Sequence, residues 1–415
     1  MKGRVIDGNE PNGTSTGWFA YVGSYSEANG GESPAKAGIR VFALDSGSGS
    51  LSLLSATMPG MEAGYLCVSR DRRFLYAVDE RKNDGRGPVG PAATVKAFAI
   101  DRQRGALTPI NSQPAFGAFP TYVSMDPAGR WVVTASHGSF DHVERVIKTE
   151  HGFVIENVYD DSTVSLYPVA GDGALQPAAD VQVLRGHGID PCESKQAGGH
   201  PQASAHAHSA AFDPWGRFVI VCDKGADKIY SYPIDAASGR FGNPTVYSAT
   251  AGSAPRHPAF HPTKPWVFVS NELASTVSCF AYNSADGSLL HVQTITATSP
   301  EYSGSNEPAD IQVHPSGRFV FVNNRGEDSV VGFAVDQDTG KLRYLGCYRL
   351  AKSIHPGLAA RSMQFDAAGR FMLVADRPAN AVLTLAVNPD TGSLSLVATT
   401  SVPQPAFVLI VSMSP

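Results

Sequence analysis

A segment of about 50 residues recurs six times in this chain. Each copy contains an apolar stretch, a turn that often begins with Asp-Pro or His-Pro, an aromatic residue and a second apolar stretch with a polar end. The aromatic residues that align the copies are Phe74, Trp131, Phe218, Trp266, Phe319 and Phe371. A repeat of this length is typical of folds in which one supersecondary unit is used many times.

Each copy is expected to form a four-stranded antiparallel sheet. The two apolar stretches around the turn predict a β-hairpin. A third strand follows in segments such as TVKAFAI, TVSCFAY and SVVGFAV, and a turn such as NSADG or DTG then leads to a fourth short strand. Four short strands, repeated in this way, predict a β-propeller.

The two ends of the chain supply a seventh unit. QPAFVLIVS (404–412) resembles a first strand, WFAYVGSYS (18–26) a second strand and GIRVFALD (38–45) a third strand. Pairing of the terminal strands within one blade would close the ring and leave no open edge between blades. We therefore predict an all-β, seven-bladed β-propeller with four-stranded blades, as a single domain over residues 1–415 with an insertion within about 138–204.

Composition and charge exclude several functional classes. The net charge is −5 and there is no Lys/Arg-rich run, so a nucleic-acid partner is not expected. The chain has no apolar stretch long enough for a membrane span and no hydrophobic signal core at its start. Its five cysteines are scattered without a CxxC pair, which favours free thiols and a cytoplasmic location. The sequence carries no signal for the oligomeric state.

Two positions of every copy are expected to meet at one mouth of the central channel, because the hairpin places the start of strand one beside the end of strand two. Ten residues before the aligned aromatic stand Gly64, Thr121, His208, Arg256, Ala309 and Arg361. Six residues after it stand Glu80, His137, Lys224, Glu272, Arg325 and Arg377. Every residue of the second set is ionisable, which core packing alone would not select. We expect this ring to be a functional site.

The third copy differs from the others because it carries two histidines, His206 and His208. His208 falls in the ring, and the alternation of side chains along a strand would place His206 on the same side. No third ligand accompanies the pair, so we predict neither a metal site nor a cofactor. His261 and His314 lie in turns at the opposite end of the hairpins and are expected to be structural.

Several segments resemble a known family. These are YVGSYS, GIRVFALD, APRHPAFHP followed by VSNELASTVS, and EPADIQVHPSGRFVFVNNRGEDSV. They resemble the lactonase family of seven-bladed β-propellers, which includes bacterial 6-phosphogluconolactonase and fungal carboxy-cis,cis-muconate cyclase. The resemblance covers the chain apart from the insertion. It implies a catalytic set of one His, two Arg and one Glu, which here are His208, Arg256, Arg325 and Glu272, all members of the ring found from spacing.

The resemblance implies a lactone hydrolase of the 6-phosphogluconolactonase type that acts on a small anionic lactone, either a sugar phosphate or a carboxylated one. His208 or Glu272 would be the general base, and Arg256 or Arg325 would stabilise the oxyanion or bind an anionic group. Further substrate contacts are expected from His206, Lys224, Arg361, Arg377, Glu80 and His137. Cations should keep Glu272 ionised and lower the pKa of His208. The alternatives are a carboxymuconate-type lactonizing cyclase and a non-catalytic propeller that binds a ligand or protein at its mouth.

Overall fold

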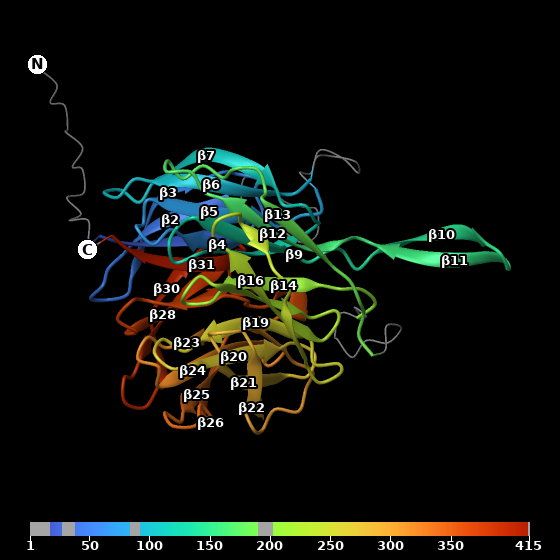
Figure 1. The fold of residues 1–415 in the computed structure, drawn as a ribbon. Coiled ribbons are helices and arrows are strands. Elements are labelled where there is room, and N and C mark those ends of the chain that lie inside the picture. Colours follow the sequence, from blue (N-terminus) through green and yellow to red (C-terminus); the bar gives the residue numbers. More distant parts are fainter. Residues whose placement is uncertain (1–16, 27–37, 84–91, 190–201, 414–415) are drawn as a thin grey trace, which may run out of the picture.

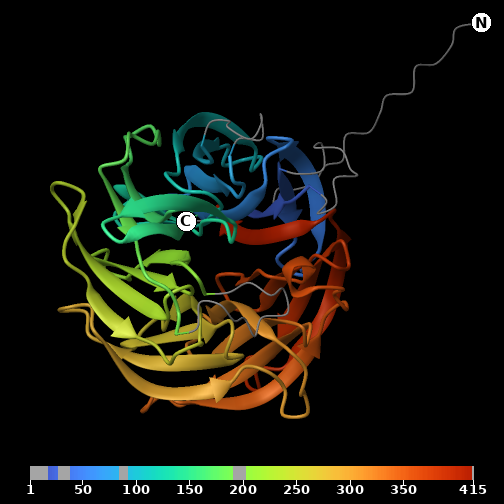
Figure 2. The same ribbon diagram turned by 90° about the vertical axis from the view of Figure 1, so that its right-hand side faces the viewer.

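The computed structural model describes residues 17–26, 38–83, 92–189 and 202–413. These residues form seven antiparallel blades that follow one another around a ring, as Figure 2 shows. The start of the chain and residues 190–201, which include Cys192 and part of the expected insertion, lie outside the described residues.

Six blades are formed by strands that are close in the sequence. The first consists of β4 (Ala63–Val68), β5 (Phe74–Asp79), β6 (Thr94–Ile100) and β7 (Leu107–Pro114), and the second of β8 (Pro120–Met125), β9 (Trp131–Ser136), β12 (Ser162–Pro168) and β13 (Asp180–Leu184). The third consists of β14 (Ala207–Phe212), β15 (Phe218–Asp223), β16 (Lys228–Asp235), β17 (Arg240–Phe241) and β18 (Thr245–Ser248), and the fourth of β19 (Pro255–Phe260), β20 (Trp266–Asn271), β21 (Thr276–Tyr282) and β22 (Leu289–Thr296). The fifth consists of β23 (Glu307–Val313), β24 (Phe319–Arg325), β25 (Ser329–Val335) and β26 (Leu342–Arg349), and the sixth of β27 (Met363–Phe365), β28 (Phe371–Asp376), β29 (Ala381–Val387) and β30 (Leu394–Ser401). A 3₁₀ helix, η2 (Pro356–Leu358), precedes the last of these blades.

The seventh blade is shared by the two ends of the chain. Its strands are β31 (Pro405–Ser412), β1 (Trp18–Ser24), β2 (Gly38–Leu44) and β3 (Leu51–Thr57), paired in that order. The innermost pair is antiparallel, with Ala20 opposite Ile410. The predicted seven-bladed propeller and its closure by the terminal strands are therefore confirmed.

The first strand of every blade lies next to the channel. Each first strand contacts the first strands of the two neighbouring blades, so that β31, β4, β8, β14, β19, β23 and β27 form a closed ring. Second strands such as β15 and β20 are buried along their whole length, whereas the fourth strands β3 and β30 are largely exposed. Burial therefore decreases from the second strand of a blade to its outer edge.

The aligned aromatic residues hold neighbouring blades together. Trp131 packs against Gly239, which lies in the turn after the third strand of the next blade and has a φ of +66°. A Cβ atom at this position would lie 2.1 Å from the indole ring. The same pair of an aromatic residue and a turn glycine recurs at the other blade interfaces, for example between Phe218 and Gly287. This contact explains why both residues recur in the sequence repeat.

The insertion after β9 forms a hairpin of its own. Within the described part of the chain, strands β10 (His142–Thr149) and β11 (Gly152–Tyr159) pair only with each other, and they project from the ring, as Figure 1 shows. We call this hairpin the arm. It rises from the channel end at which β9 finishes.

Candidate functional site

The ring residues of the first strands owe their orientation to β-bulges. In five blades the pairing of the first and second strands shifts at this point, so that one strand carries an extra residue. The extra residues are Gly64, Thr121, His208 and Arg256, while in β23 the shift spans Ala309 and Asp310. A bulge interrupts the alternation of side chains and redirects the residue that it contains.

A cavity of about 380 Å³ occupies this mouth of the channel. Most of the predicted residues line it: Glu80, His137, His208, Lys224, Arg256, Glu272, Arg325 and Arg361. Other lining residues include Thr121, Phe140, Asp141, Glu307, His355 and Gly357. Four cationic and four acidic side chains therefore face the cavity, in addition to the histidines.

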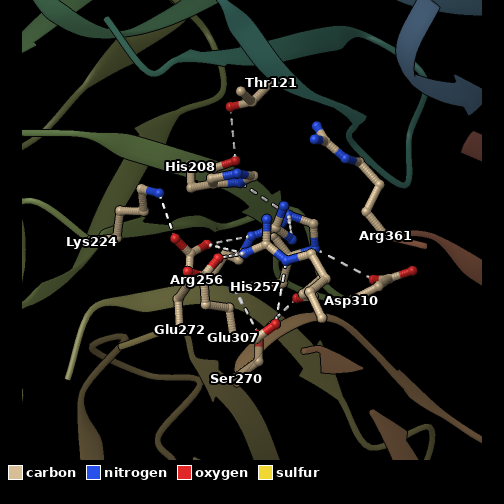
Figure 3. Close-up of polar contacts among 12 residues, drawn as sticks. Thr121, His208, Lys224, Arg256, His257, Ser270, Glu272, Glu307, Asp310 and Arg361 are labelled. Carbon is tan, nitrogen blue, oxygen red and sulfur yellow. Dashed lines mark hydrogen bonds and ion pairs between the residues drawn. The ribbon is translucent and has the colours of Figure 1, made fainter. Parts of the chain in front are cut away.

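Glu272 lies at the centre of a buried cluster of charges, visible in Figure 3. Its Oε1 accepts a hydrogen bond of 2.6 Å from Lys224 Nζ, and its Oε2 lies 2.9 Å from both Arg256 Nε and Arg325 Nη2. Burial alone would raise the pKa of Glu272, but Lys224, Arg325 and Arg256 together hold it well below the usual range. The carboxyl group is therefore ionised at neutral pH, as the sequence predicted.

Arg325 is fixed by a second carboxylate. Its Nη2 lies 3.3 Å from Glu307 Oε2, and its Nε donates to the Glu307 carbonyl oxygen at 3.2 Å. Burial and the neighbouring Arg325 lower the pKa of Arg256 to about 10, which leaves this side chain charged at neutral pH. The two guanidinium groups are thus held in place before any substrate binds.

His208 lies beside this cluster and is neutral at pH 7. Burial lowers its pKa well below the usual value, and the charge of Arg256 lowers it further. Its Nδ1 is 3.2 Å from Nε2 of His257, and its carbonyl oxygen accepts a hydrogen bond from Thr121. The Arg256 guanidinium therefore shifts the pKa of His208 in the predicted direction, and burial contributes more.

A second group of charges lies apart from the Glu272 cluster. Arg361 Nη1 is 3.5 Å from Glu80 Oε1 and donates to the Tyr25 hydroxyl at 3.1 Å, while that hydroxyl donates to Glu80 Oε2. Figure 3 shows Arg361 separated from Glu272. Gly64 makes room for this arrangement, because a Cβ atom there would lie 2.0 Å from Glu80 Oε2. The Nε of Arg361 has no hydrogen-bond partner among the described residues.

The chain matches the family model described as lactonase, 7-bladed β-propeller, over residues 19–410. The chain belongs to this family. It is 29% identical to the 6-phosphogluconolactonase of Bacillus subtilis over 394 residues, which cover 95% of this chain and 98% of that relative. It is 27% identical to the 6-phosphogluconolactonase of Formosa agariphila over 381 residues, which cover 90% and 94% of the two chains.

A solved structure extends the similarity to three dimensions. The periplasmic gluconolactonase of Pseudomonas aeruginosa has a TM-score of 0.79 to this chain at 25% identity, and the match covers 96% of this chain and 99% of that one. Among the residues that our structure describes, no helix is long and apolar enough to cross a membrane. The same residues contain no group of three His, Cys, Asp or Glu side chains placed to hold a metal ion.

Two residues expected to contact the substrate do not line the cavity of this lactonase-family protein. The ring of His206 stacks on that of His137 at 4.4 Å, and its Nδ1 hydrogen-bonds to the His137 carbonyl oxygen. Alternation along the strand predicted a common side for His206 and His208, but the bulge at His208 interrupts that alternation. Arg377 donates to Gln404 and to the Gly357 carbonyl oxygen, so it supports the wall of the cavity from behind.

The arm's base supplies a part of the wall that the repeat could not predict. Phe140 lies between β9 and the arm, and Lys224 Nζ is 5.4 Å from the centre of its ring. Phe140 also packs edge-on against His137. Because this segment has no counterpart in the other blades, its sequence gave no signal of a place at the site.

Sequence reasoning also missed His257 and Asp310. Each follows its ring position by one residue, directly after Arg256 and Ala309. In a regular strand they would face away from the ring residues. The bulges place His257 next to His208 instead, and His257 Nδ1 lies 3.3 Å from Asp310 Oδ1.

Proposed function

We propose that this chain hydrolyses a small lactone in the cavity at the channel mouth. The observation that carries the proposal is a buried, neutral histidine, His208, beside two guanidinium groups that a buried carboxylate holds in place. Lactone hydrolysis needs a base for the attacking water and positive charge for the oxyanion of the tetrahedral intermediate. The names of the curated relatives support the same reaction.

Of the two bases left open by the sequence, His208 fits better than Glu272. Both carboxylate oxygens of Glu272 contact cations, and its lowered pKa makes it a weak proton acceptor. Its role would be to hold Lys224, Arg256 and Arg325 in position. His208 has its Nε2 free of hydrogen bonds within the described part of the chain and lines the cavity.

In the proposed reaction, His208 Nε2 removes a proton from water while the water oxygen attacks the lactone carbonyl carbon. The carbonyl oxygen becomes an oxyanion, which Arg256 or Arg325 stabilises. When the intermediate collapses, the bond between the carbonyl carbon and the ring oxygen breaks. The protonated His208 then gives its proton to the leaving alkoxide, and the product is an open hydroxy acid.

We propose 6-phosphogluconolactone as the first substrate to test. The B. subtilis and F. agariphila relatives are named for it, whereas the P. aeruginosa structure is named as a gluconolactonase. Arg361 supports an anionic substrate, because it lines the cavity and lies apart from the Glu272 cluster. This position could hold a phosphate or carboxylate at the far end of the lactone.

The test is the rate of lactone hydrolysis by purified protein, with spontaneous hydrolysis subtracted. We expect turnover of 6-phosphogluconolactone by the wild type, and a loss of roughly 100-fold or more in kcat for His208→Ala. Arg217→Gln, on the opposite end of the hairpin, is the matched control and should keep full activity. Equal rates for the wild type and His208→Ala would refute the assigned base. Turnover of carboxylated muconolactones alone would instead favour the cyclase.

We also propose a cytoplasmic location. The four cysteines in the described residues, Cys67, Cys222, Cys279 and Cys347, are all free thiols. Free thiols are typical of a reducing compartment. Because the P. aeruginosa structure is of a periplasmic protein, cell fractionation is the direct test, and recovery from an oxidising compartment would refute the proposal.

A further inference from the structure

A chain of three side chains, Asp310, His257 and His208, runs from the channel to the cavity, as Figure 3 shows. We propose that Asp310 and His257 are positioning residues that fix which nitrogen of His208 carries its proton. This inference rests on the proposed function, because a base at His208 needs an unprotonated nitrogen at the cavity. His257 itself does not line the cavity, and it faces a second space of about 390 Å³ in the channel.

The hydrogen bonds of His257 determine its tautomer. Arg256 Nη1 lies 3.3 Å from His257 Nε2, and a guanidinium group can only donate. His257 Nε2 must therefore be an acceptor, so the proton of the neutral ring is on Nδ1. That nitrogen lies 3.3 Å from Asp310 Oδ1, which is an acceptor when the carboxyl group is ionised.

The tautomer of His208 follows from that of His257. His208 Nδ1 lies 3.2 Å from the same Nε2 of His257, whose single lone pair it shares with Arg256 Nη1. A proton on His208 Nδ1 makes it a donor there and avoids two lone pairs that face each other. The second ring nitrogen of His208, Nε2, then carries the lone pair. A base with its lone pair toward the cavity can accept a proton from water in a single step.

Asp310 is well placed to anchor this chain. Its Oδ1 accepts from the Ile311 backbone N–H at 2.9 Å, and its Oδ2 accepts from the Met363 backbone N–H of the next blade at 3.0 Å. The rings of Tyr65 and Tyr122 pack edge-on against His257, with centroids 5.9 and 5.3 Å away. The carboxylate and the first imidazole are thus fixed from both sides.

Positively and negatively charged groups face the rings of His208 and His257. His208 faces Arg256, His257, Lys224 and His137, and His257 faces Arg256, Asp310, Glu272, His208, Tyr65 and Tyr122. In the resting protein, burial and the nearby cations lower the pKa of both rings and keep them neutral. When His208 takes up a proton during the reaction, its positive charge can be stabilised through His257 by Asp310, as the aspartate does in a Ser-His-Asp triad.

The first experiment measures the tautomer directly, by ¹⁵N NMR of histidine-labelled wild-type protein at pH 7.5. We expect the resonances of His208, assigned by comparison with His208→Ala, to show a proton on Nδ1 and none on Nε2. A proton on Nε2 would overturn the proposal. This readout does not depend on turnover, so an inactive protein with the expected tautomer would refute the proposed function and leave this inference standing.

The second experiment compares His257→Leu with His257→Gln. Leu removes the acceptor, so we expect kcat to fall roughly 10- to 100-fold with little change in KM. The Gln side-chain oxygen can replace the acceptor at Nε2 and should restore part of the loss. Arg217→Gln, in the exposed turn at the opposite end of the hairpin, is the control and should keep its activity. Equal losses for Leu and Gln in folded protein would show a packing role and overturn the proposal.

A second inference comes from the arm. Both of its faces are exposed, and it carries large apolar side chains in water, with Val146 exposed by 72%, Phe153 by 73% and Ile155 by 66%. A two-stranded hairpin with no further support is at best marginally stable in water. Exposed apolar side chains and an unpaired strand edge are typical of an interface.

The free edge of β10 is complementary to itself. The turn at 150–151 has two residues, so the backbone groups of Thr149 and Gly152 exchange hydrogen bonds. Counting back from Thr149, every second residue of β10 directs its backbone N–H and C=O toward β11. The backbone groups of Glu144, Val146 and Lys148 therefore point to the free edge. In an antiparallel pair of two β10 strands about Val146, each Glu144 stands opposite Lys148 of the second copy.

We infer that two copies of this chain pair through β10 to form a continuous four-stranded sheet with a two-fold axis at Val146. Sedimentation equilibrium tests this by measuring the dimer dissociation constant. We expect a dimer for the wild type, an increase of about 10-fold in that constant for Glu144→Lys or Lys148→Glu alone, and recovery in the double variant. A monomeric wild type, unchanged single variants or a double variant that does not recover would each overturn it.

Discussion

The substitution Glu272→Gln tests whether the charge cluster at the site is also a structural element. Glu272 is 1% exposed at its side chain and contacts three cations, of which Arg256 and Arg325 are themselves buried. Gln keeps the shape but removes the negative charge. Two guanidinium groups would then remain buried beside each other without their shared partner.

Removal of one partner from a buried ion pair costs roughly 3–5 kcal/mol. For 415 residues, the unfolding entropy is about 0.9 kcal/mol per kelvin at roughly 2.1 cal/mol/K per residue. The melting temperature at pH 7 should therefore fall by roughly 3–6 °C. Lys224 can relieve part of the repulsion because burial already lowers its pKa, whereas the arginines stay charged.

The loss should depend on pH in a defined direction. Because the pKa of Glu272 is lower in the folded protein than in the unfolded chain, its stabilisation is present above the unfolded value of 4.5 and is lost as the pH falls through the folded value. The difference in melting temperature between the wild type and Glu272→Gln should thus be largest near pH 7 and should shrink in acid.

Differential scanning calorimetry of both proteins from pH 7.5 down to about pH 3 measures these differences, because the loss lies below the unfolded pKa of 4.5. Asp390→Asn is the matched control, because Asp390 is 88% exposed and lies 4.0 Å from Arg318, so its loss should change the melting temperature by about 1 °C or less. If Glu272→Gln and Asp390→Asn have the same melting temperature at pH 7, the cluster does not stabilise the fold and the reasoning fails.

The remaining predictions concern the base, the anion contact and the blade interface. Since burial lowers the pKa of His208, the acid limb of kcat/KM should have its midpoint below pH 6.5, and a midpoint at or above that value would contradict a neutral base. Arg361→Gln should lower kcat/KM for 6-phosphogluconolactone roughly 10- to 100-fold more than for glucono-δ-lactone, with Arg217→Gln as the control. Gly239→Ala should cost roughly 1–3 kcal/mol in unfolding free energy, measured by denaturation, because its Cβ would meet an indole ring. Gly252→Ala has a similar φ of +73° but no neighbour within 4 Å, so it should cost less, and equal costs would show that backbone strain alone is responsible.

The fold was predictable because each blade repeats the same local signals. The turn residues, the aligned aromatics and the third strands occur in every copy, so a strand or turn that is ambiguous in one copy can be assigned from the others. The mouth of the channel was predictable for the same reason, since one register places Glu272, Lys224 and Arg325 at the same height in three blades.

What the sequence could not predict arises from contacts between blades and from local irregularity. The bulges that bring His257 next to His208 have no marker in the repeat, and they also explain why His206 lies behind the cavity. Glu307 holds Arg325 from outside the two ring positions. Phe140 belongs to an insertion that only one blade carries. None of these features follows from the pattern that the copies share.

The cations of the site create a problem for the base, and Asp310 offers the solution. Arg256 and Lys224 would stabilise an oxyanion, but the same charges lower the pKa of His208 and so weaken it as a base. A carboxylate in direct contact with His208 would correct this, but it would also neutralise the cations. Asp310 contacts His257 rather than His208, so it can stabilise a protonated His208 through His257 without touching Arg256. This separation lets one small cavity hold a working base without placing a further carboxylate beside the cations that Glu272 already pairs.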